Sequence, residues 1–77
     1  MQSFDISMPH RHTVRCQSNV RTLDFEVELL SDGIVFYCSN PKIIEGKSSS
    51  FESEISAIEA WLRLKFRNVE VDRSPFA

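Results

Sequence analysis

The segment 51–66 constrains the fold of this chain more than any other, because it predicts a helix with two apolar stripes. At about 100° per residue, one stripe forms a single line along the helix: Phe51, Ile55, Ile58, Leu62 and Phe66. The second stripe lies further round: Ala57, Ala60, Trp61 and Leu64. A chain of 77 residues has one small core. The first stripe is therefore expected inside, and the second needs a cover from the N-terminal run 4–8, from Phe76 or from a partner.

Signals at both ends support this helix. Ser49 and Glu52 have the S-x-x-E spacing of a capping box, and Ser53 is an alternative cap. Acidic residues near the start and basic residues near the end suit the helix dipole: Glu52, Glu54, Arg63, Lys65 and Arg67.

The stretch 23–29 alternates apolar odd positions with acidic even positions, which predicts a half-buried strand with its odd residues inward. The dipeptide Asp32-Gly33 predicts a two-residue hairpin turn. With that turn, four cross-strand pairs follow, two inward and two outward: Leu29 with Phe36, Val27 with Cys38, Glu28 with Tyr37, and Leu30 with Val35.

A strand over 11–17 is expected to precede this hairpin and to pair with it. Placing Val14 and Cys16 inward sets Cys16 opposite Leu23. The same register sets two opposite charges across the ladder, which favours it: Arg15 with Asp24 and Arg11 with Glu28.

The remaining segments complete a small α+β fold. Residues 3–8 alternate and could add a strand at the front, Asn40-Pro41 is expected to end the third strand, and 42–45 could continue as an extended piece. A final short strand over 68–72 is expected beside and parallel to the first strand of the meander, at the sheet edge. The sequence thus predicts one domain over 1–77, a two-layer sandwich of a three- or four-stranded antiparallel β-meander on one helix, in the order β-β-β-α-β.

Catalytic and metal-binding chemistry is not indicated. His10 and His12 form an H-x-H pair, but a metal site needs three or four ligands, so no metal is expected. Cys16 and Cys38 fall on strands separated by another strand, about 10 Å apart, which is too far for a disulfide. We interpret both as small buried side chains. With two glycines and no phosphate loop or nucleophile motif, the chain is expected to be no enzyme and to use no cofactor.

Charge gives limited support for nucleic-acid binding. The net charge of −2 excludes a general polycation, although Arg11, Arg15 and Arg21 could make local contacts on the first hairpin. The acidic row 24–28 predicts a solvated face that Arg11 and Arg15 partly balance.

Apolar surface gives the main functional signal. Leu30, Val35 and Tyr37 are expected to gather on the outer face of the sheet, and the second helix stripe adds Ala57, Trp61 and Leu64. Contiguous apolar residues of this kind usually mark contact sites, so we predict a partner interface here and, through the second stripe, a homodimer. No segment has the length of a membrane span or the pattern of a signal peptide, which predicts a cytoplasmic protein without membrane contact.

The leading hypothesis is a small non-catalytic binding protein. It would mask a surface of a protein or nucleoprotein partner, as phage-encoded inhibitors such as anti-CRISPR proteins do. One alternative is a regulatory module of the HicB-antitoxin type, and another is a nucleic-acid-binding domain that uses the first hairpin.

Overall fold

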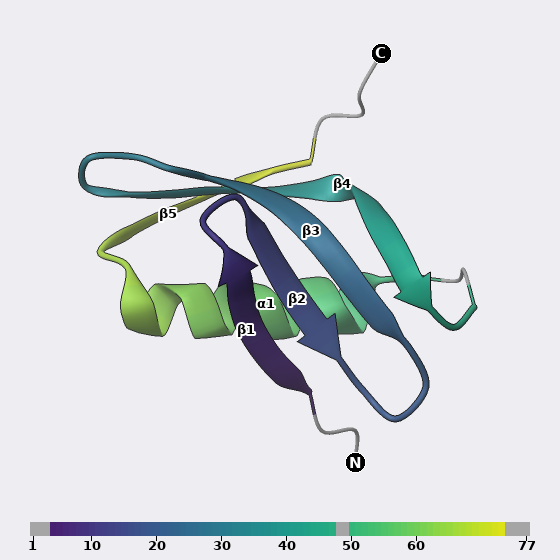
Figure 1. Cartoon of the computed structure of the whole chain (residues 1–77). Coiled ribbons are helices and arrows are strands. Elements are labelled where there is room, and N and C mark those ends of the chain that lie inside the picture. The colour runs from purple at the N-terminus through teal and green to yellow at the C-terminus, as the bar shows by residue number, and fades with distance from the viewer. Residues whose placement is uncertain (1–3, 48–49, 74–77) are drawn as a thin grey trace.

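The structure is a computed structural model that describes residues 4–47 and 50–73, arranged as one five-stranded sheet with a helix across one face (Figure 1). The elements are β1 (Asp5–His10), β2 (Thr13–Gln17), β3 (Thr22–Leu29), β4 (Gly33–Glu45), α1 (Glu52–Lys65) and β5 (Asn68–Asp72). The α+β class is confirmed. The order is β-β-β-β-α-β, one strand more than predicted, because the N-terminal alternation forms the full strand β1.

The last strand lies at the opposite edge from the one predicted. The strand order is β1-β2-β3-β4-β5, and β5 runs parallel to β4 with Phe36 opposite Val71. β1 already occupies the edge beside β2. The chain leaves β4, passes through α1 and returns as β5 directly beside β4. These three elements form a parallel β-α-β unit.

The pairing of β2 with β3 confirms the predicted register. Cys16 lies opposite Leu23, and Arg15 lies opposite Asp24. The pair of Arg11 with Glu28 was wrong, because β2 begins only at Thr13 and Arg11 lies in the turn before it.

The predicted register of the β3–β4 hairpin was wrong by two residues. Val27 lies opposite Phe36 and Leu29 opposite Ile34, so the loop is 31–32. Gly33 does not adopt a positive φ; a Cβ on it would collide with the backbone of Asn68 in β5. A shift of two residues keeps every side chain on its predicted face, because side chains alternate with period two.

β4 also continues past the point where it was expected to end. Tyr37 pairs with Glu26 and Lys42 pairs with Asp24, so residues 38–41 bulge out opposite a single residue of β3. A bulge tolerates proline because the local ladder is interrupted there. The predicted extended piece 42–45 is confirmed as the end of β4.

The core lies between the sheet and the first helix stripe. Its buried members are Val14, Cys16, Leu23, Phe25, Val27, Ile34, Phe36, Cys38, Ile55, Ile58 and Leu62. Phe25 and Phe36 meet edge to face, with ring centroids 5.3 Å apart. Both cysteines are free and buried, as predicted, and burial is the main reason that the pKa of Cys16 rises to about 11.

The helix begins with Phe51 as its N-cap residue, without a side-chain cap. Ser53 lies inside the helix, so its predicted capping role was wrong. Ser49, the other predicted cap, lies outside the described residues.

Candidate partner-binding surface

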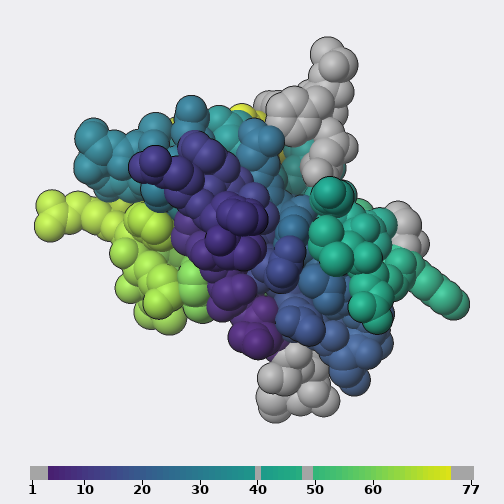
Figure 2. Space-filling view, in the orientation of Figure 1, coloured from purple at the N-terminus to yellow at the C-terminus, as the bar shows by residue number. Residues whose placement is uncertain are grey.

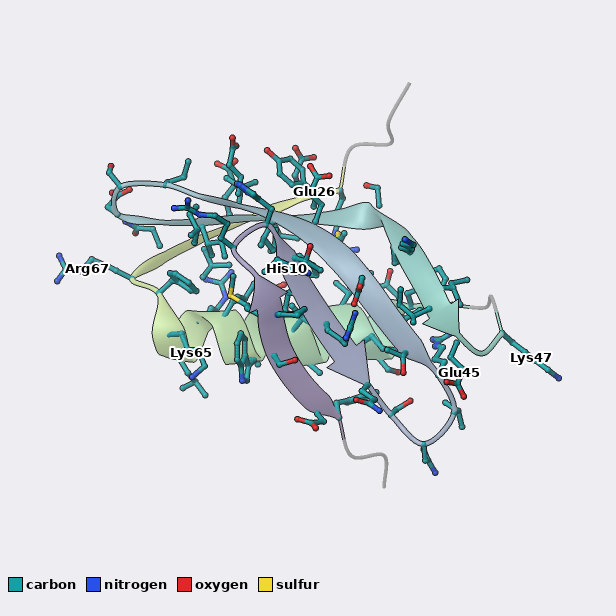
Figure 3. All side chains as sticks on the ribbon, viewed as in Figure 1. His10, Glu26, Glu45, Lys47, Lys65 and Arg67 are labelled. Atoms are coloured by element: carbon teal, nitrogen blue, oxygen red, sulfur yellow. The ribbon has the colours of Figure 1, made fainter. Side chains whose placement is uncertain are left out.

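The face of the sheet turned away from α1 carries a group of carboxylates around one tyrosine. Strand alternation and the observed pairings place residues of β3, β4 and β5 side by side on this face. Figure 3 shows Glu26 on this side and Lys65 of α1 on the other. We call the following residues the acidic face: Glu26, Glu28, Tyr37, Glu70 and Asp72.

Tyr37 lies at the centre of the acidic face. Its hydroxyl donates a hydrogen bond to Oε2 of Glu28 at 3.1 Å. That bond is the main reason that the pKa of Tyr37 is raised, followed by partial burial and by the negative charges of Glu28, Asp72 and Glu26. Three carboxylates thus act on one phenol, which keeps its proton and remains a hydrogen-bond donor at neutral pH.

Near β2, the charge balance predicted for this side of the sheet is confirmed. Nε and Nη2 of Arg15 donate to the two carboxylate oxygens of Asp24, at 2.8 and 3.1 Å. Within the described part of the chain, Glu26, Glu28 and Glu70 form no ion pair. The face of β3–β5 therefore keeps a local excess of negative charge.

The predicted outer apolar patch is only partly exposed. Val35 is 6% exposed, so its expected exposure was wrong, and its contact with a partner stays a prediction. Its cross-strand neighbours Glu28 and Glu70 have long side chains that flank it on both sides. Tyr37 is half-buried, whereas Leu30 is 48% exposed beside Leu29 at the β3–β4 hairpin tip, which projects from the body of the molecule (Figure 2).

The second helix stripe is divided between core and surface. Leu64 is 87% exposed, and Ala60 is exposed too. Trp61 instead packs against the core cluster, with Nζ of Lys65 4.8 Å from its ring centroid, and Ala57 is half-buried.

The N-terminal run, one of the predicted covers, packs against the same core cluster as Trp61. Its apolar members are Phe4, Ile6 and Met8. Phe76, the other predicted cover from this chain, lies outside the described residues.

Arg21, a predicted nucleic-acid contact, is committed to a buried ion pair. Its side chain is 8% exposed, and that of Glu54 is 4% exposed. Nε donates to Oε2 of Glu54 at 2.5 Å, and Nη2 donates to Oε1 at 2.8 Å. The guanidinium also donates to the carbonyl oxygens of Lys47 and Ser50 and lies 4.8 Å from the ring centroid of Phe51. Arg21 thus joins the β2–β3 loop to the start of α1.

No local sequence pattern indicates this pair, since its partners are 33 residues apart. Glu54 was interpreted only as a helix-dipole residue. The hydrogen bond from Arg21 is the main cause that lowers the pKa of Glu54, so the carboxylate stays ionised.

The three predicted arginines do not form one basic surface. Arg11 is exposed in the β1–β2 turn, Arg15 is paired with Asp24, and Arg21 is buried with Glu54. His10 and His12 are exposed near Arg11. Over residues 4–47 and 50–73, no three histidine, cysteine or acidic side chains are arranged to hold a metal ion.

Comparisons with protein-family models, curated proteins and solved structures returned no match to this chain. In the described part of the chain, α1 is neither long nor apolar enough to cross a membrane.

Proposed function

We propose that this protein is a non-catalytic binding protein that masks a basic surface of a protein or nucleoprotein partner. The acidic face would meet the Lys- or Arg-rich part of that surface, and Leu30 at the hairpin tip would contact apolar residues beside it. The observation that carries the proposal is the position of Tyr37, which is half-buried on β4 between carboxylates of the two flanking strands, β3 and β5.

The composition of this surface suits such a partner. Tyrosine is enriched at interfaces because it combines a large apolar ring with a hydrogen-bonding hydroxyl. Opposite charges across an interface accelerate association and select the partner. Leu30, which is 48% exposed and lies on the same face as Glu28, adds apolar area next to the charged region.

Nucleic-acid binding by the first hairpin has less support, because the side chains of Arg15 and Arg21 already bind carboxylates of the same chain. The HicB-like regulatory module stays a prediction, and so does the homodimer. Exposed Leu64 is compatible with either.

The test is capture of a partner from nuclease-treated extract of the source cells. The double variant Glu26→Lys/Glu28→Lys reverses two charges on the acidic face. We expect this variant to capture less than about 10% of the partner protein that the wild type captures. Retention by the wild type should also fall as salt rises from about 0.05 to 0.5 M, because the charges are then screened.

The matched control is Glu52→Lys/Glu59→Lys, which changes the net charge equally on α1, away from the acidic face. Because Glu52 and Glu59 form ion pairs with Arg73 and Arg63, urea denaturation first checks that this control is folded. This variant should retain the partner. Equal capture by both double variants would contradict the proposal, and tight binding of free oligonucleotides by the wild type would favour the nucleic-acid alternative.

A further inference from the structure

The two edge strands of the sheet differ in how well they could pair with another chain. β1 contains Pro9, which has no N–H, and its pairing is irregular between Ser7 and His10. β5 (Asn68–Asp72) contains no proline and pairs with β4 in an unbroken parallel register. Prolines and bulges are common means of blocking an edge. Only β1 has this protection among the described edges.

β5 is also held firmly enough to act as a template. Nδ2 of Asn68 donates to the carbonyl oxygen and to Oδ2 of Asp32, at 3.2 and 3.0 Å. Because Gly33 has no side chain, β4 and β5 can approach each other closely where β5 begins, at Asn68. Val69 and Val71 pack against the core cluster on the inner face. The strand is therefore ordered before any partner arrives, which lowers the entropic cost of binding.

The side chains of β5 indicate the chemistry of a strand that would lie beside it. Glu70 and Asp72 belong to the acidic face, whereas Val69 and Val71 lie on the face of the core. A neighbouring strand with alternating side chains would place one set beside the carboxylates and the other beside the valines. The first set should be basic and the second apolar.

We infer that β5 accepts an extended segment of the partner as a sixth strand, with lysine or arginine alternating with apolar residues. The inference rests on the proposed function and adds main-chain pairing to the contacts of the acidic face. A second copy of this chain fits less well. Full antiparallel pairing of two β5 strands would set Glu70 opposite Glu70, and like charges directly opposite destabilise a ladder.

The test uses the full ¹⁵N-labelled protein and a synthetic hexapeptide of alternating lysine and valine. On titration to millimolar peptide, we expect the largest amide shifts in 68–72 and smaller ones in 5–10. Amide exchange in β5 should slow at least tenfold. The same peptide N-methylated at every residue cannot donate main-chain hydrogen bonds and should bind at least tenfold more weakly.

A charge exchange provides the matched control. Glu70→Lys should weaken binding of the lysine peptide at least fivefold and strengthen binding of the corresponding glutamate–valine peptide. The inference is overturned if no shift occurs, if β1 shifts more than β5, or if N-methylation has no effect. Shifts confined to Glu26, Glu28 and Tyr37 of β3 and β4, unchanged by N-methylation, would overturn strand addition and leave the proposed function standing. The capture experiment tests that function separately.

Discussion

The two faces of β3 and β4 are formed by alternate residues of the same strands, yet they differ in chemistry and in exposure to solvent. On the inner face, Val27 and Phe36 lie opposite each other and are 1% and 0% exposed. On the outer face, Glu26 lies opposite Tyr37, and the carboxylate is exposed. The inner residues have the chemistry that folding requires, since burial of apolar surface is the main stabilising term. The outer carboxylates contribute no such term, and we propose that they serve partner binding instead.

The largest effect should come from the inner face. Phe36→Ala removes a fully buried ring that meets Phe25 edge to face. We expect a loss of about 3–5 kcal/mol in the free energy of unfolding, measured by urea denaturation. For a domain of this size, that loss would leave much of the protein unfolded at 25 °C. Tyr37→Phe on the outer face should cost much less, because it removes the solvent-exposed hydrogen bond to Glu28. Equal losses would contradict the division between the faces.

The next largest effect concerns the buried ion pair. Arg21→Met leaves the Glu54 carboxylate buried without its partner and should cost about 3 kcal/mol. The double variant Arg21→Met/Glu54→Leu should recover most of that loss, because no unpaired charge then remains. A double variant as unstable as the single one would show that the lost contacts to the β4–α1 loop, and not the charge, determine the cost.

The same pair predicts a dependence on pH. The pKa of Glu54 is lower in the folded chain than its unfolded value of about 4.3. The stabilisation is therefore complete above that unfolded value and is lost as the pH falls through the folded pKa. Denaturation curves between pH 6 and 2 should show a loss of stability below about pH 4. Arg21→Met should lack this component of the loss.

Substitutions at the two large residues of the second helix stripe should differ in their effect on stability. A change at Trp61 should destabilise the fold, and a change at Leu64 should not. Trp61→Lys removes a half-buried indole from the core rim and should cost about 1–2 kcal/mol. Leu64→Lys should change the free energy of unfolding by no more than about 0.5 kcal/mol. If the chain forms a homodimer through this stripe, sedimentation should show a monomer for Leu64→Lys without unfolding. Unfolding by Leu64→Lys would instead place that residue in the core.

A smaller effect tests the environment of Tyr37. Glu28→Gln replaces the charged carboxylate that accepts the hydrogen bond of the phenol with a neutral amide. The pKa of Tyr37 should therefore move down towards its ordinary value. Ultraviolet absorbance followed from pH 8 to 12 measures this shift. Glu59→Gln on α1 serves as the control and should leave the titration unchanged. An unchanged curve for Glu28→Gln would mean that this carboxylate does not act on Tyr37.

Local periodicity predicted most of the inner face. Alternation in β3 and the 3.6-residue period of α1 placed Phe25, Ile58 and Leu62 in the core, because burial follows directly from these patterns. The predicted sheet edge for β5 was wrong, since the order of strands depends on which edges other strands already occupy. The predicted hairpin register was also wrong. Gly33 is required by the close approach of β5 to its Cα, whereas the prediction assigned it to the turn.

The candidate surface was harder to predict. Leu30 and Tyr37 were identified from alternation, whereas Glu70 and Asp72 join them only because β5 lies beside β4. The burial of Arg21 depends on Glu54 from a distant element, and nothing in the sequence near Arg21 indicates such a partner. Side chains that meet through tertiary packing leave no local pattern.

The outer carboxylates, which we propose to serve binding, should not be required for the fold. The most direct measurement is the free energy of unfolding of Glu26→Gln/Glu70→Gln by urea denaturation at low salt. We expect a value equal to or above that of the wild type, within about 0.5 kcal/mol, because like charges are removed from one face and no ion pair is broken. A loss greater than about 1.5 kcal/mol would show that these carboxylates stabilise the fold and would contradict the account.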